Sequence, residues 1–358
     1  MKYDKLFERW DWHGFSLKSR ICVAPLVIYT WSDDTGRVTD KQVAHYRELV
    51  HGGAGLVLQE ATSISREGRL TLDQLGIWDD GHIDGLRRIA AVMHDAGMPA
   101  ILQLSHAGIL STHPDKVCPS EYMVGMGTAC VRHAREMTVP EIEQVTQQFI
   151  DGARRAYAAG YDGVQLHCCH GYLLSQFLNP KVNRRTDAYN AADKLLVRNI
   201  IQGIRAVTPP EFIVGARLGA FEPTLADGIA NARWLQAMGV DFIDAYYGCD
   251  WEAELEKPAD FPHTPAIYGA QCIKQAVSIP VFACNEIRTG EQAEDILRRT
   301  GVDMVTLGRA HLVNPSWGND VRAGRDPGTC FSCAVCHWKY APDTCPGHLQ
   351  LERSRSGK

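Results

Sequence analysis

The sequence lacks three features that would place it in common classes of protein. No uninterrupted apolar run approaches the roughly 18 residues that a membrane-spanning helix needs. The N-terminal segment MKYDKLFERWDW has charges where a secretion signal has an apolar core. Neither sign of charge dominates, because 37 Lys and Arg residues against 42 Asp and Glu residues leave a net charge of −5. We therefore expect a soluble, cytoplasmic protein that has no membrane or nucleic-acid partner.

Glycine-rich loops that bind nucleotide phosphates are also absent. The chain contains no Gly-x-Gly-x-x-Gly segment and no Gly-x-x-x-x-Gly-Lys-Ser/Thr segment. This absence argues against a doubly wound sheet that binds a dinucleotide. Apolar residues make up 45% of the chain and charged residues 22%, which is typical of a globular protein rather than a disordered one. The length of 358 residues fits two domains or one large α/β barrel, and no low-complexity linker divides the chain.

Eight short apolar blocks have the composition of strands buried on both faces. They cover residues 21–24, 55–60, 100–104, 163–167, 212–217, 242–245, 281–284 and 304–307. Helices are predicted between them at residues 41–51, 82–96, 140–160, 193–206, 226–238, 265–277 and 290–300. This alternation predicts a (β/α)8 TIM barrel over residues 1–325. We expect an insertion at residues 105–139 and an irregular, cysteine-rich tail at residues 326–358.

Polar and titratable residues gather at the predicted carboxyl ends of the strands, where barrels of this kind have their active sites. His167 and His170 lie three residues apart after a strand, so one tight turn can direct both imidazoles at a carbonyl oxygen. Packing histidines or half of a metal site are the alternatives. Arg217 ends an apolar strand, where a buried guanidinium needs a partner, and a structural ion pair is the alternative. Gln103 can both donate and accept hydrogen bonds.

Together, these residues and their neighbours resemble the Old Yellow Enzyme family of FMN-dependent oxidoreductases. The matching segments are SRICVAPL, LGIWDDGHIDGL, QLSHAG, GYDGVQLHCCHGYLLSQFLNP, NRRTDAY and GVDMVTLGRAHLVNP. The resemblance extends from about residue 3 to about residue 325. It implies that FMN binds without a covalent bond and that NAD(P)H delivers hydride to flavin N5. The implied reaction is ene-reduction, in which hydride passes to the β-carbon of an enone or enoate.

The resemblance also assigns roles to individual residues. His167 and His170 would hold the substrate carbonyl, and Tyr172 would protonate the α-carbon. Tyr29 and Tyr246 would form walls of the substrate pocket. The flavin would lie against Pro25, Leu26, Val27, Ala61, Gln103, Arg217, Asn285, Glu286, Gly308 and Arg309.

Within this cofactor site the implied contacts differ in chemistry. Arg217 would lie beside the flavin N1–C2=O edge and stabilise negative charge there. Gln103 suits the pyrimidine edge, and the small Ala61 lets the backbone approach the ring. Gly308 and Arg309 would bind the phosphate.

Three cofactor positions depart from the family pattern. Asn285 and Glu286 stand where the family has glycine more often. Asparagine tolerates positive φ, so the turn can persist, but Glu286 would repel a phosphate unless its side chain points away. Val27 stands where many relatives have Cys or Thr, so we expect a different flavin potential.

The tail contains four of the twelve cysteines. Cys330, Cys333, Cys336 and Cys345 form a C-x2-C-x2-C-x8-C-P pattern in CFSCAVCHWKYAPDTCP. The pattern resembles the iron–sulfur segment of dienoyl-CoA reductase and trimethylamine dehydrogenase relatives, which implies a [4Fe-4S] cluster. A zinc knot and free thiols without a metal are the alternatives.

Two other functions are compatible with parts of the sequence. In the first, the chain is a flavin and iron–sulfur electron-transfer subunit that works with a separate flavoprotein. The second is a non-flavin barrel such as an aldolase, although no lysine at a predicted strand end is available for a Schiff base. Relatives often pair or tetramerise, which leaves a homo-oligomer open. The sequence does not distinguish NADH from NADPH.

Overall fold

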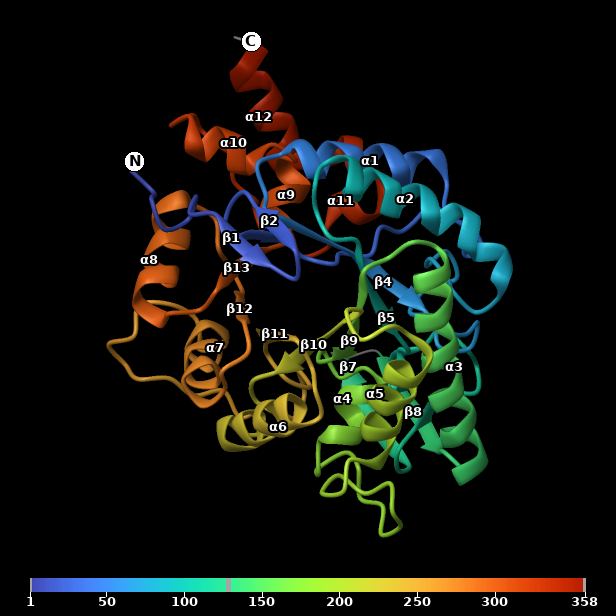
Figure 1. Ribbon diagram of the computed structural model, residues 1–358. Coiled ribbons are helices and arrows are strands. Elements are labelled where there is room, and N and C mark those ends of the chain that lie inside the picture. The colour runs from blue at the N-terminus through green and yellow to red at the C-terminus, as the bar shows by residue number, and fades with distance from the viewer. Residues whose placement is uncertain (1, 127–129, 357–358) are drawn as a thin grey trace.

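Eight parallel strands close into a barrel in the computed structural model, which describes residues 2–126 and 130–356 (Figure 1). The strands are β3 (Ile21–Val23), β4 (Leu56–Ser63), β5 (Ile101–Ser105), β9 (Gly163–Cys168), β10 (Ile213–Gly219), β11 (Phe242–Tyr246), β12 (Val281–Cys284) and β13 (Met304–Leu307). They follow one another in chain order, and β13 closes the barrel by pairing with β3, where Val305 lies opposite Ile21. The predicted (β/α)8 barrel is confirmed, and every predicted strand is present.

Helices form a ring around the strands, as Figure 1 shows. They are α1 (Asp40–His51), α2 (Ile83–Asp95), α3 (Val139–Ala158), α5 (Leu195–Val207), α6 (Leu225–Ala237), α7 (Pro265–Ala276) and α8 (Gly290–Thr300). Local sequence determines where several of them begin. At the start of α3, Thr138 and Glu141 bond to each other's backbone N–H groups, and Thr224 and Asp227 do the same for α6. All seven predicted helices are confirmed.

A short N-terminal hairpin closes the amino end of the barrel. Its strands β1 (Trp10–Trp12) and β2 (Phe15–Leu17) are antiparallel. The ring centroid of Trp12 lies 5.4 Å from that of Phe242 and 6.4 Å from that of Phe282. Both phenylalanines point into the barrel, so the hairpin completes its apolar filling at this end. Strands of three residues are too short to show a periodicity, and the sequence did not predict them.

The predicted insertion after β5 forms a small sheet. Its strands β6 (Val117–Cys118), β7 (Tyr122–Met126) and β8 (Cys130–Glu136) pair in the order β6–β8–β7. Apolar side chains of the insertion pack against Tyr172 and Trp251. The sheet therefore covers one side of the carboxyl end of the barrel, next to a residue predicted to be catalytic. The insertion was expected, but its strands were not.

The chain beyond β13 is more regular than the sequence predicts. It contains α9 (Arg309–Val313), α10 (Trp317–Arg322), α11 (His337–Tyr340) and α12 (Pro346–Ser356). These helices lie beside α1 in Figure 1. Trp338 and Leu351 of the tail pack against Ile28 and Val313 of the barrel. Contact with the barrel, rather than a strong apolar period of their own, stabilises the tail helices, which is why they were expected to be irregular.

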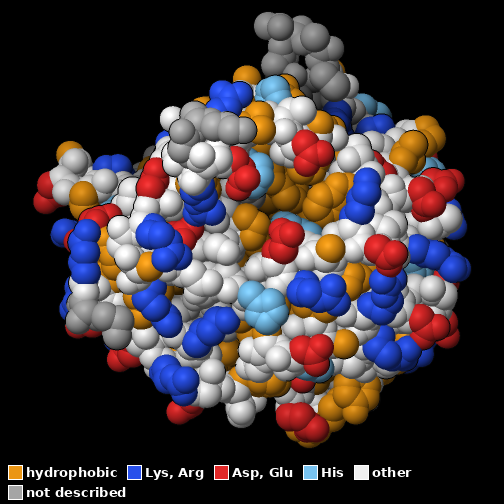
Figure 2. Space-filling model, turned by 90° about the horizontal axis from the view of Figure 1, so that it is seen from above, with side chains coloured by type: hydrophobic (Ala, Val, Ile, Leu, Met, Phe, Trp, Pro, Cys, Tyr) orange, Lys and Arg blue, Asp and Glu red, His pale blue; other side chains and the backbone are white. Residues whose placement is uncertain are grey.

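The helices and the surface charges are relevant to whether the protein binds a membrane or a nucleic acid. None of the helices in the described part of the chain combines the length and the apolar character that crossing a membrane requires. Basic and acidic side chains are interspersed over the face shown in Figure 2. This mixed surface is consistent with the small net charge of −5.

Candidate active site

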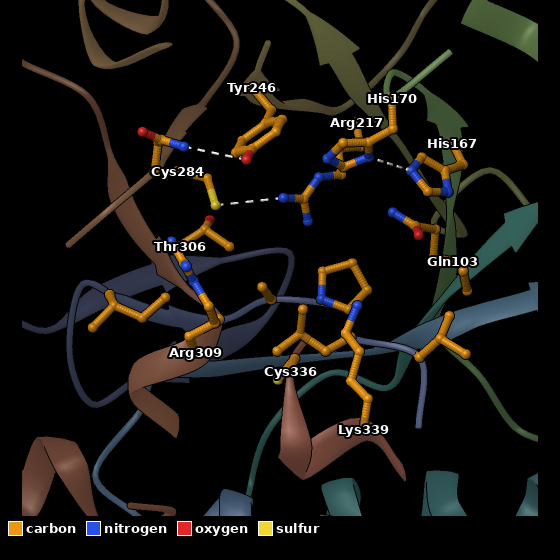
Figure 3. A pocket seen from close by; sticks show the side chains of 18 of the residues that line it. Gln103, His167, His170, Arg217, Tyr246, Cys284, Thr306, Arg309, Cys336 and Lys339 are labelled. Carbon is orange, nitrogen blue, oxygen red and sulfur yellow. Dashed lines mark hydrogen bonds between the residues drawn. The ribbon is translucent and has the colours of Figure 1, made fainter. Parts of the chain in front are cut away.

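A cavity of about 400 Å³ opens at the carboxyl ends of the barrel strands. Every residue predicted to bind substrate or flavin lines it, namely Pro25, Leu26, Val27, Tyr29, Ala61, Gln103, His167, His170, Tyr172, Arg217, Tyr246, Asn285, Glu286, Gly308 and Arg309. Of the four tail cysteines, Cys330 and Cys336 line it and the other two do not. Figure 3 shows Arg217 and Tyr246 on one side of this space and the tail residues Cys336 and Lys339 on the opposite side.

A buried carboxyl holds the loop after β3 that forms one wall of the cavity. The backbone N–H of Ile28 donates to Glu60 Oε2 at 3.0 Å, and the Tyr46 hydroxyl lies 3.4 Å from Glu60 Oε1. Burial raises the pKa of Glu60 to about 8, although the bonds from Ile28 and Tyr46 oppose the rise. Glu60 therefore keeps the segment from Pro25 to Val27 in place as a protonated hydrogen-bonding group over most of the physiological pH range.

Gln103 and Arg217 form the polar edge of the cavity. Gln103 Nε2 donates to Gln165 Oε1 at 2.7 Å, which leaves Gln103 Oε1 buried without a partner among the described residues. Arg217 Nη1 lies 3.3 Å from Asp244 Oδ2, and Nη2 lies 3.4 Å from Cys284 Sγ. Burial disfavours the guanidinium charge, but Asp244 together with Cys284, Cys169 and Tyr246 more than offsets this and raises the pKa of Arg217.

The unpartnered atoms at this edge fit a flavin. Gln103 Oε1 is an acceptor and Arg217 Nε is a donor, and both are buried without a partner within the described chain. Buried polar groups normally have hydrogen-bond partners, so their presence indicates a polar ligand. The pyrimidine ring of FMN offers an N–H group to Gln103 and acceptor atoms to Arg217, so the residues present fit the cofactor that the family resemblance implies.

Two histidines meet beside two tyrosines deeper in the cavity. His167 Nε2 lies 2.9 Å from His170 Nδ1, and the left-handed backbone of His170, with φ 60°, turns its ring back toward the strand. The Tyr172 ring lies 4.6 Å from that of His167, and the Tyr246 ring lies 4.6 Å from that of His170. Burial and the charge of Arg217 lower the pKa of both imidazoles well below the usual value, so both are neutral.

Two arginines gather at the loops after β12 and β13. Arg288 Nη2 and Arg309 Nη1 donate to the Ser332 hydroxyl of the tail at 3.0 and 3.2 Å. Glu286 Oε1 lies 3.8 Å from each guanidinium. The Glu286 carboxylate therefore faces both arginines instead of pointing away, and the two cations compensate its charge. Asn285 adopts a positive φ, as expected for the residue that replaces glycine.

The tail adds side chains to the cavity that the sequence did not indicate. Lys339 lines it with its Nζ 5.5 Å from the centroid of the Tyr29 ring, and burial lowers the pKa of this lysine. The Tyr340 ring stacks on Tyr29 with centroids 5.3 Å apart. Trp338 anchors the segment against Trp31 at a centroid distance of 5.5 Å. The tail therefore contributes side chains to the site, in addition to following the barrel in the sequence.

The four tail cysteines do not converge on a zinc-type centre. Among the described residues, three metal-ligating atoms lie within 4.8 Å of one another only at His167, Cys169 and His170. Tetrahedral zinc with bonds of about 2.3 Å to sulfur needs thiolates within about 4 Å of one another. Cys345 lies in an apolar cluster against which Cys330 and Cys336 also pack, and the metal group of Cys330, Cys333, Cys336 and Cys345 stays a prediction.

Several residues of the site were missed from the sequence. Asp244 lies in the apolar block FIDAY of β11, and a lone carboxylate there is a signal for a buried cation. Glu60 ends a predicted strand, where a lone carboxyl group is likewise a signal for a buried polar partner. Cys284 and Lys339 gave none, because an apolar strand accommodates a thiol and the tail was expected to be irregular.

Comparisons with known proteins agree with the barrel and its cavity. Residues 5–327 match the family model described as NADH:flavin oxidoreductase / NADH oxidase family. A curated NADPH dehydrogenase of Geobacillus sp. (strain WCH70) is 33% identical over 345 residues, which cover 94% of this chain and 99% of that protein. The NADPH dehydrogenase of Bacillus pumilus (strain SAFR-032) is 34% identical over 321 residues, which cover 87% and 92%.

The class of protein is therefore an NAD(P)H-dependent flavin oxidoreductase. The chain belongs to the NADH:flavin oxidoreductase / NADH oxidase family, and the predicted resemblance to the Old Yellow Enzyme family is confirmed.

Solved structures share the fold. The old yellow enzyme homologue from Zymomonas mobilis has a TM-score of 0.74 at 25% identity, covering 89% of this chain and 93% of that chain. 2-Naphthoyl-CoA reductase in complex with 2-naphthoyl-CoA has a TM-score of 0.84 at 23% identity, covering 96% of this chain and 56% of that chain. This chain therefore spans little more than half of that reductase. The match to this reductase covers 96% of the chain, whereas residues 1–325 make up 91% of it. The shared fold therefore includes part of the tail.

Proposed function

We propose that the protein reduces the C=C bond of an α,β-unsaturated carbonyl compound, an enone or enoate. The proposal rests on the His167–His170 pair, whose facing nitrogens are 2.9 Å apart beside Tyr172, in the cavity that also contains the unpartnered Gln103 Oε1 and Arg217 Nε. When bound, FMN takes a hydride from NAD(P)H and supplies it to the β-carbon of the substrate.

His167 and His170 bind the carbonyl oxygen of the substrate. Each neutral imidazole has one N–H donor, and at the carboxyl end of β9 one of the two bonds to the other ring at 2.9 Å, so a substrate oxygen would replace this bond between the rings. Negative charge develops on the carbonyl oxygen as the β-carbon accepts hydride, so N–H donors directed at this oxygen stabilise the transition state more than the ground state.

Tyr172 donates the proton to the α-carbon. Burial raises the pKa of its hydroxyl, so the phenol keeps its proton at neutral pH. The enolate-like carbon that forms when hydride reaches the β-carbon is strongly basic, and a phenol is acidic enough to protonate it. The Tyr172 ring lies 4.6 Å from the ring of His167, so a substrate held by the histidines has the hydroxyl nearby.

The remaining side chains hold the cofactor. Gln103 and Arg217 bind the pyrimidine edge, where the Arg217 charge stabilises negative charge. Arg309, with Gly308 beside it, binds the phosphate, and Arg288 adds a second cation near the same place. Residues 1–325 would supply this flavin barrel, and residues 326–358 would close one wall of it.

Separated half-reactions test the proposal. The holoenzyme is reduced anaerobically with NADPH or NADH and then mixed with 2-cyclohexen-1-one while the flavin absorbance is followed. We expect the enone to reoxidise the flavin and a deuteride from labelled NADPH to appear at the β-carbon of the ketone. The double variant His167→Ala, His170→Ala should lose the binding of phenols, which mimic an enolate. A protein that NADPH reduces but that no enone or enoate reoxidises would contradict the proposal.

A second candidate function follows from the position of the tail. Cys330 and Cys336 line the same cavity as the flavin-binding residues, as expected for a subunit that exchanges electrons with a separate flavoprotein. This function requires iron in the protein. Iron and zinc assays on anaerobically purified protein, together with its visible spectrum, decide the question. About four irons per chain would favour the electron-transfer subunit, and a flavin spectrum without iron would exclude it.

A further inference from the structure

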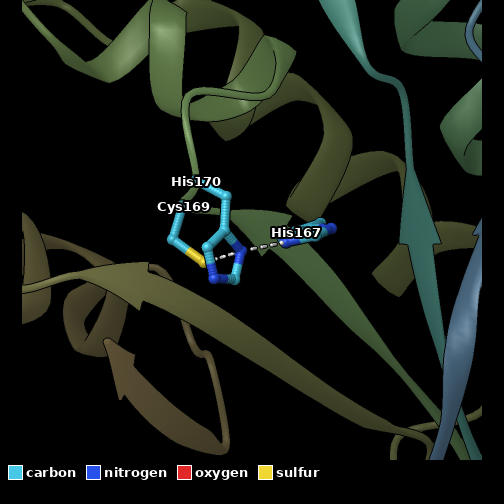
Figure 4. A group of neighbouring side chains, drawn as sticks. All are labelled: His167, Cys169 and His170. Atoms are coloured by element: carbon cyan, nitrogen blue, oxygen red, sulfur yellow. Dashed lines mark hydrogen bonds between the residues drawn. The ribbon is translucent and has the colours of Figure 1, made fainter. Parts of the chain in front are cut away.

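Cys169 lies against the two histidines, and the proposed reaction does not use it. Its Sγ lies 3.1 Å from His170 Nδ1, and this same nitrogen lies 2.9 Å from His167 Nε2. All three ligand atoms lie within 4.8 Å of one another. Figure 4 shows the sulfur and the His167 ring directed at the His170 ring, between the end of β9 and the turn that follows. Among the side chains that the structure describes, no other group of three His, Cys, Asp or Glu residues meets this distance.

The local backbone explains why only one of two adjacent cysteines takes part. Cys168 is the last residue of β9, and its side chain belongs to the main apolar core. Cys169 is the first residue of the turn and lies outside that core cluster, although it is also fully buried. The left-handed conformation of His170 then folds its ring onto the Cys169 sulfur.

We propose that His167, Cys169 and His170 form a binding site for Zn²⁺ or a similar divalent transition-metal ion. Two imidazoles and one thiolate are a common zinc ligand set, and three protein ligands leave the fourth tetrahedral position open. Zinc bonds of about 2.0–2.3 Å need nitrogens and sulfur roughly 3.4–3.6 Å apart. The observed distances of 2.9 and 3.1 Å are about 0.5 Å shorter, so a bound ion would move the three side chains apart by about that amount.

Charge near the site permits the ion. The thiol proton of Cys169 passes to solvent as the metal–sulfur bond forms, and no electron is transferred. The resulting thiolate cancels one of the two charges of the ion. The charge of Arg217, which lowers the pKa of both imidazoles, also opposes a cation there, and Asp244, whose Oδ2 lies 3.3 Å from Arg217 Nη1, offsets part of it.

A bound ion would block the oxygen site. The imidazole nitrogens that face each other would donate their lone pairs to the metal, so they could no longer bond to a substrate oxygen. Zinc should therefore act as a reversible inhibitor that competes with any ligand held by His167 and His170. The metal site follows from the positions of the three side chains and does not depend on which substrate the enzyme reduces.

Two matched variants test the site in the holoenzyme. Cys169→Ser removes the sulfur ligand, and Cys168→Ser makes the same change one residue away in the core. Both keep the four tail cysteines, so zinc bound by the tail is equal in the two proteins. After equilibration with Zn²⁺ and gel filtration, we expect Cys169→Ser to retain one zinc ion per chain fewer than Cys168→Ser and wild type. Co²⁺ should produce a weaker thiolate absorption band in Cys169→Ser alone. Equal metal contents and bands in all three proteins would overturn the proposal.

A competition experiment tests the site in the wild-type protein, so its result does not depend on whether a variant folds. The affinity for 4-hydroxybenzaldehyde is measured from the flavin spectrum with and without Zn²⁺. At a zinc concentration ten times its own dissociation constant, competition predicts an apparent dissociation constant about tenfold higher, and a chelator should reverse the change. Zinc that binds without changing the affinity for the phenol would show that the ion does not occupy this site.

Discussion

Arg217 and Asp244 form an ion pair inside the barrel. They occupy paired positions on the neighbouring strands β10 and β11, and Arg217 Nη1 lies 3.3 Å from Asp244 Oδ2. The two side chains are 6% and 0% exposed, so neither charge has water as an alternative partner. The register of two strands thus places a permanent cation at the polar edge of the cavity, where it can act on a flavin instead of on solvent.

Replacing Asp244 with asparagine should lower the free energy of unfolding by about 3–5 kcal/mol, because the Arg217 charge stays buried without its partner. The affinity for FMN should also fall. Urea unfolding of the variant and of wild type measures the first effect, and flavin titration measures the second. Asp84→Asn is the control, since it removes an exposed partner of Arg87 and should change stability little. Equal effects of the two substitutions would show that the buried pair has no special role.

Tyr172→Phe should separate the two half-reactions. Without its hydroxyl the enzyme loses the proton donor, and general-acid catalysis typically contributes 10²–10⁴-fold, so enone-dependent reoxidation should slow by roughly this factor. Reduction of the flavin by NADPH should keep its rate. Stopped-flow absorbance measures both steps. Tyr189→Phe, which changes a buried tyrosine that does not line the cavity, is the control. An unchanged rate of enone reduction in Tyr172→Phe would mean that the proton comes from another donor.

Glu60 should make stability depend on pH. Burial raises its pKa from 4.5 to about 8, so between these values the folded protein holds a proton that the unfolded chain has released. The stabilisation that this group provides is complete below pH 4.5. It falls by about 1.4 kcal/mol per pH unit as the pH rises from 4.5, and it is lost as the pH passes through 8. Glu222, whose pKa burial also raises to about 8, contributes in the same direction.

Glu60→Gln keeps the shape of the side chain and removes its titration. The fall in unfolding free energy between pH 5 and 8, which urea denaturation measures, should become shallower by about 1.4 kcal/mol per unit. Glu222→Gln should have a similar effect, and the double variant should be the flattest. Parallel pH profiles for Glu60→Gln and wild type would show that Glu60 is already ionised in the folded protein.

Trp338→Ala should detach the tail from the barrel. Trp338 is 7% exposed and packs between Trp31 and His45, and the loss of a buried tryptophan typically costs about 3–5 kcal/mol. Limited proteolysis should cut the tail of the variant faster, and FMN should dissociate faster because the wall made by Lys339 and Cys336 opens. Leu349→Ala, at a half-exposed position of α12, is the control and should do neither. A tail that stays resistant in Trp338→Ala would mean that other contacts hold it.

The barrel could be predicted because buried parallel strands have a strong local signature. Blocks such as the one that contains Phe242 are apolar throughout, and helix starts such as Thr138 with Glu141 form local caps. The site followed from the same strands, because polar residues such as His167 and Arg217 stand at their carboxyl ends. Family resemblance added Tyr172 and the flavin contacts, which spacing alone does not assign.

What could not be predicted depends on contacts between distant parts of the chain. Asp244 becomes a partner of Arg217 only through the register of β10 and β11. The tail helices have little periodicity of their own and are held by packing on residues near Ile28. Likewise, the spacing of the tail cysteines shows that a metal centre is chemically feasible, but the fold decides where each sulfur lies.

The closure of the barrel also has a consequence for biosynthesis. β3 is the first barrel strand in the chain and pairs with both β4 and β13, the last one. A ribosome therefore releases β3 long before its second neighbour exists, and one edge of the growing sheet remains unpaired for most of translation. Such contacts between distant segments also form slowly. We expect the nascent chain to stay open and dependent on protection from aggregation until β13 has emerged.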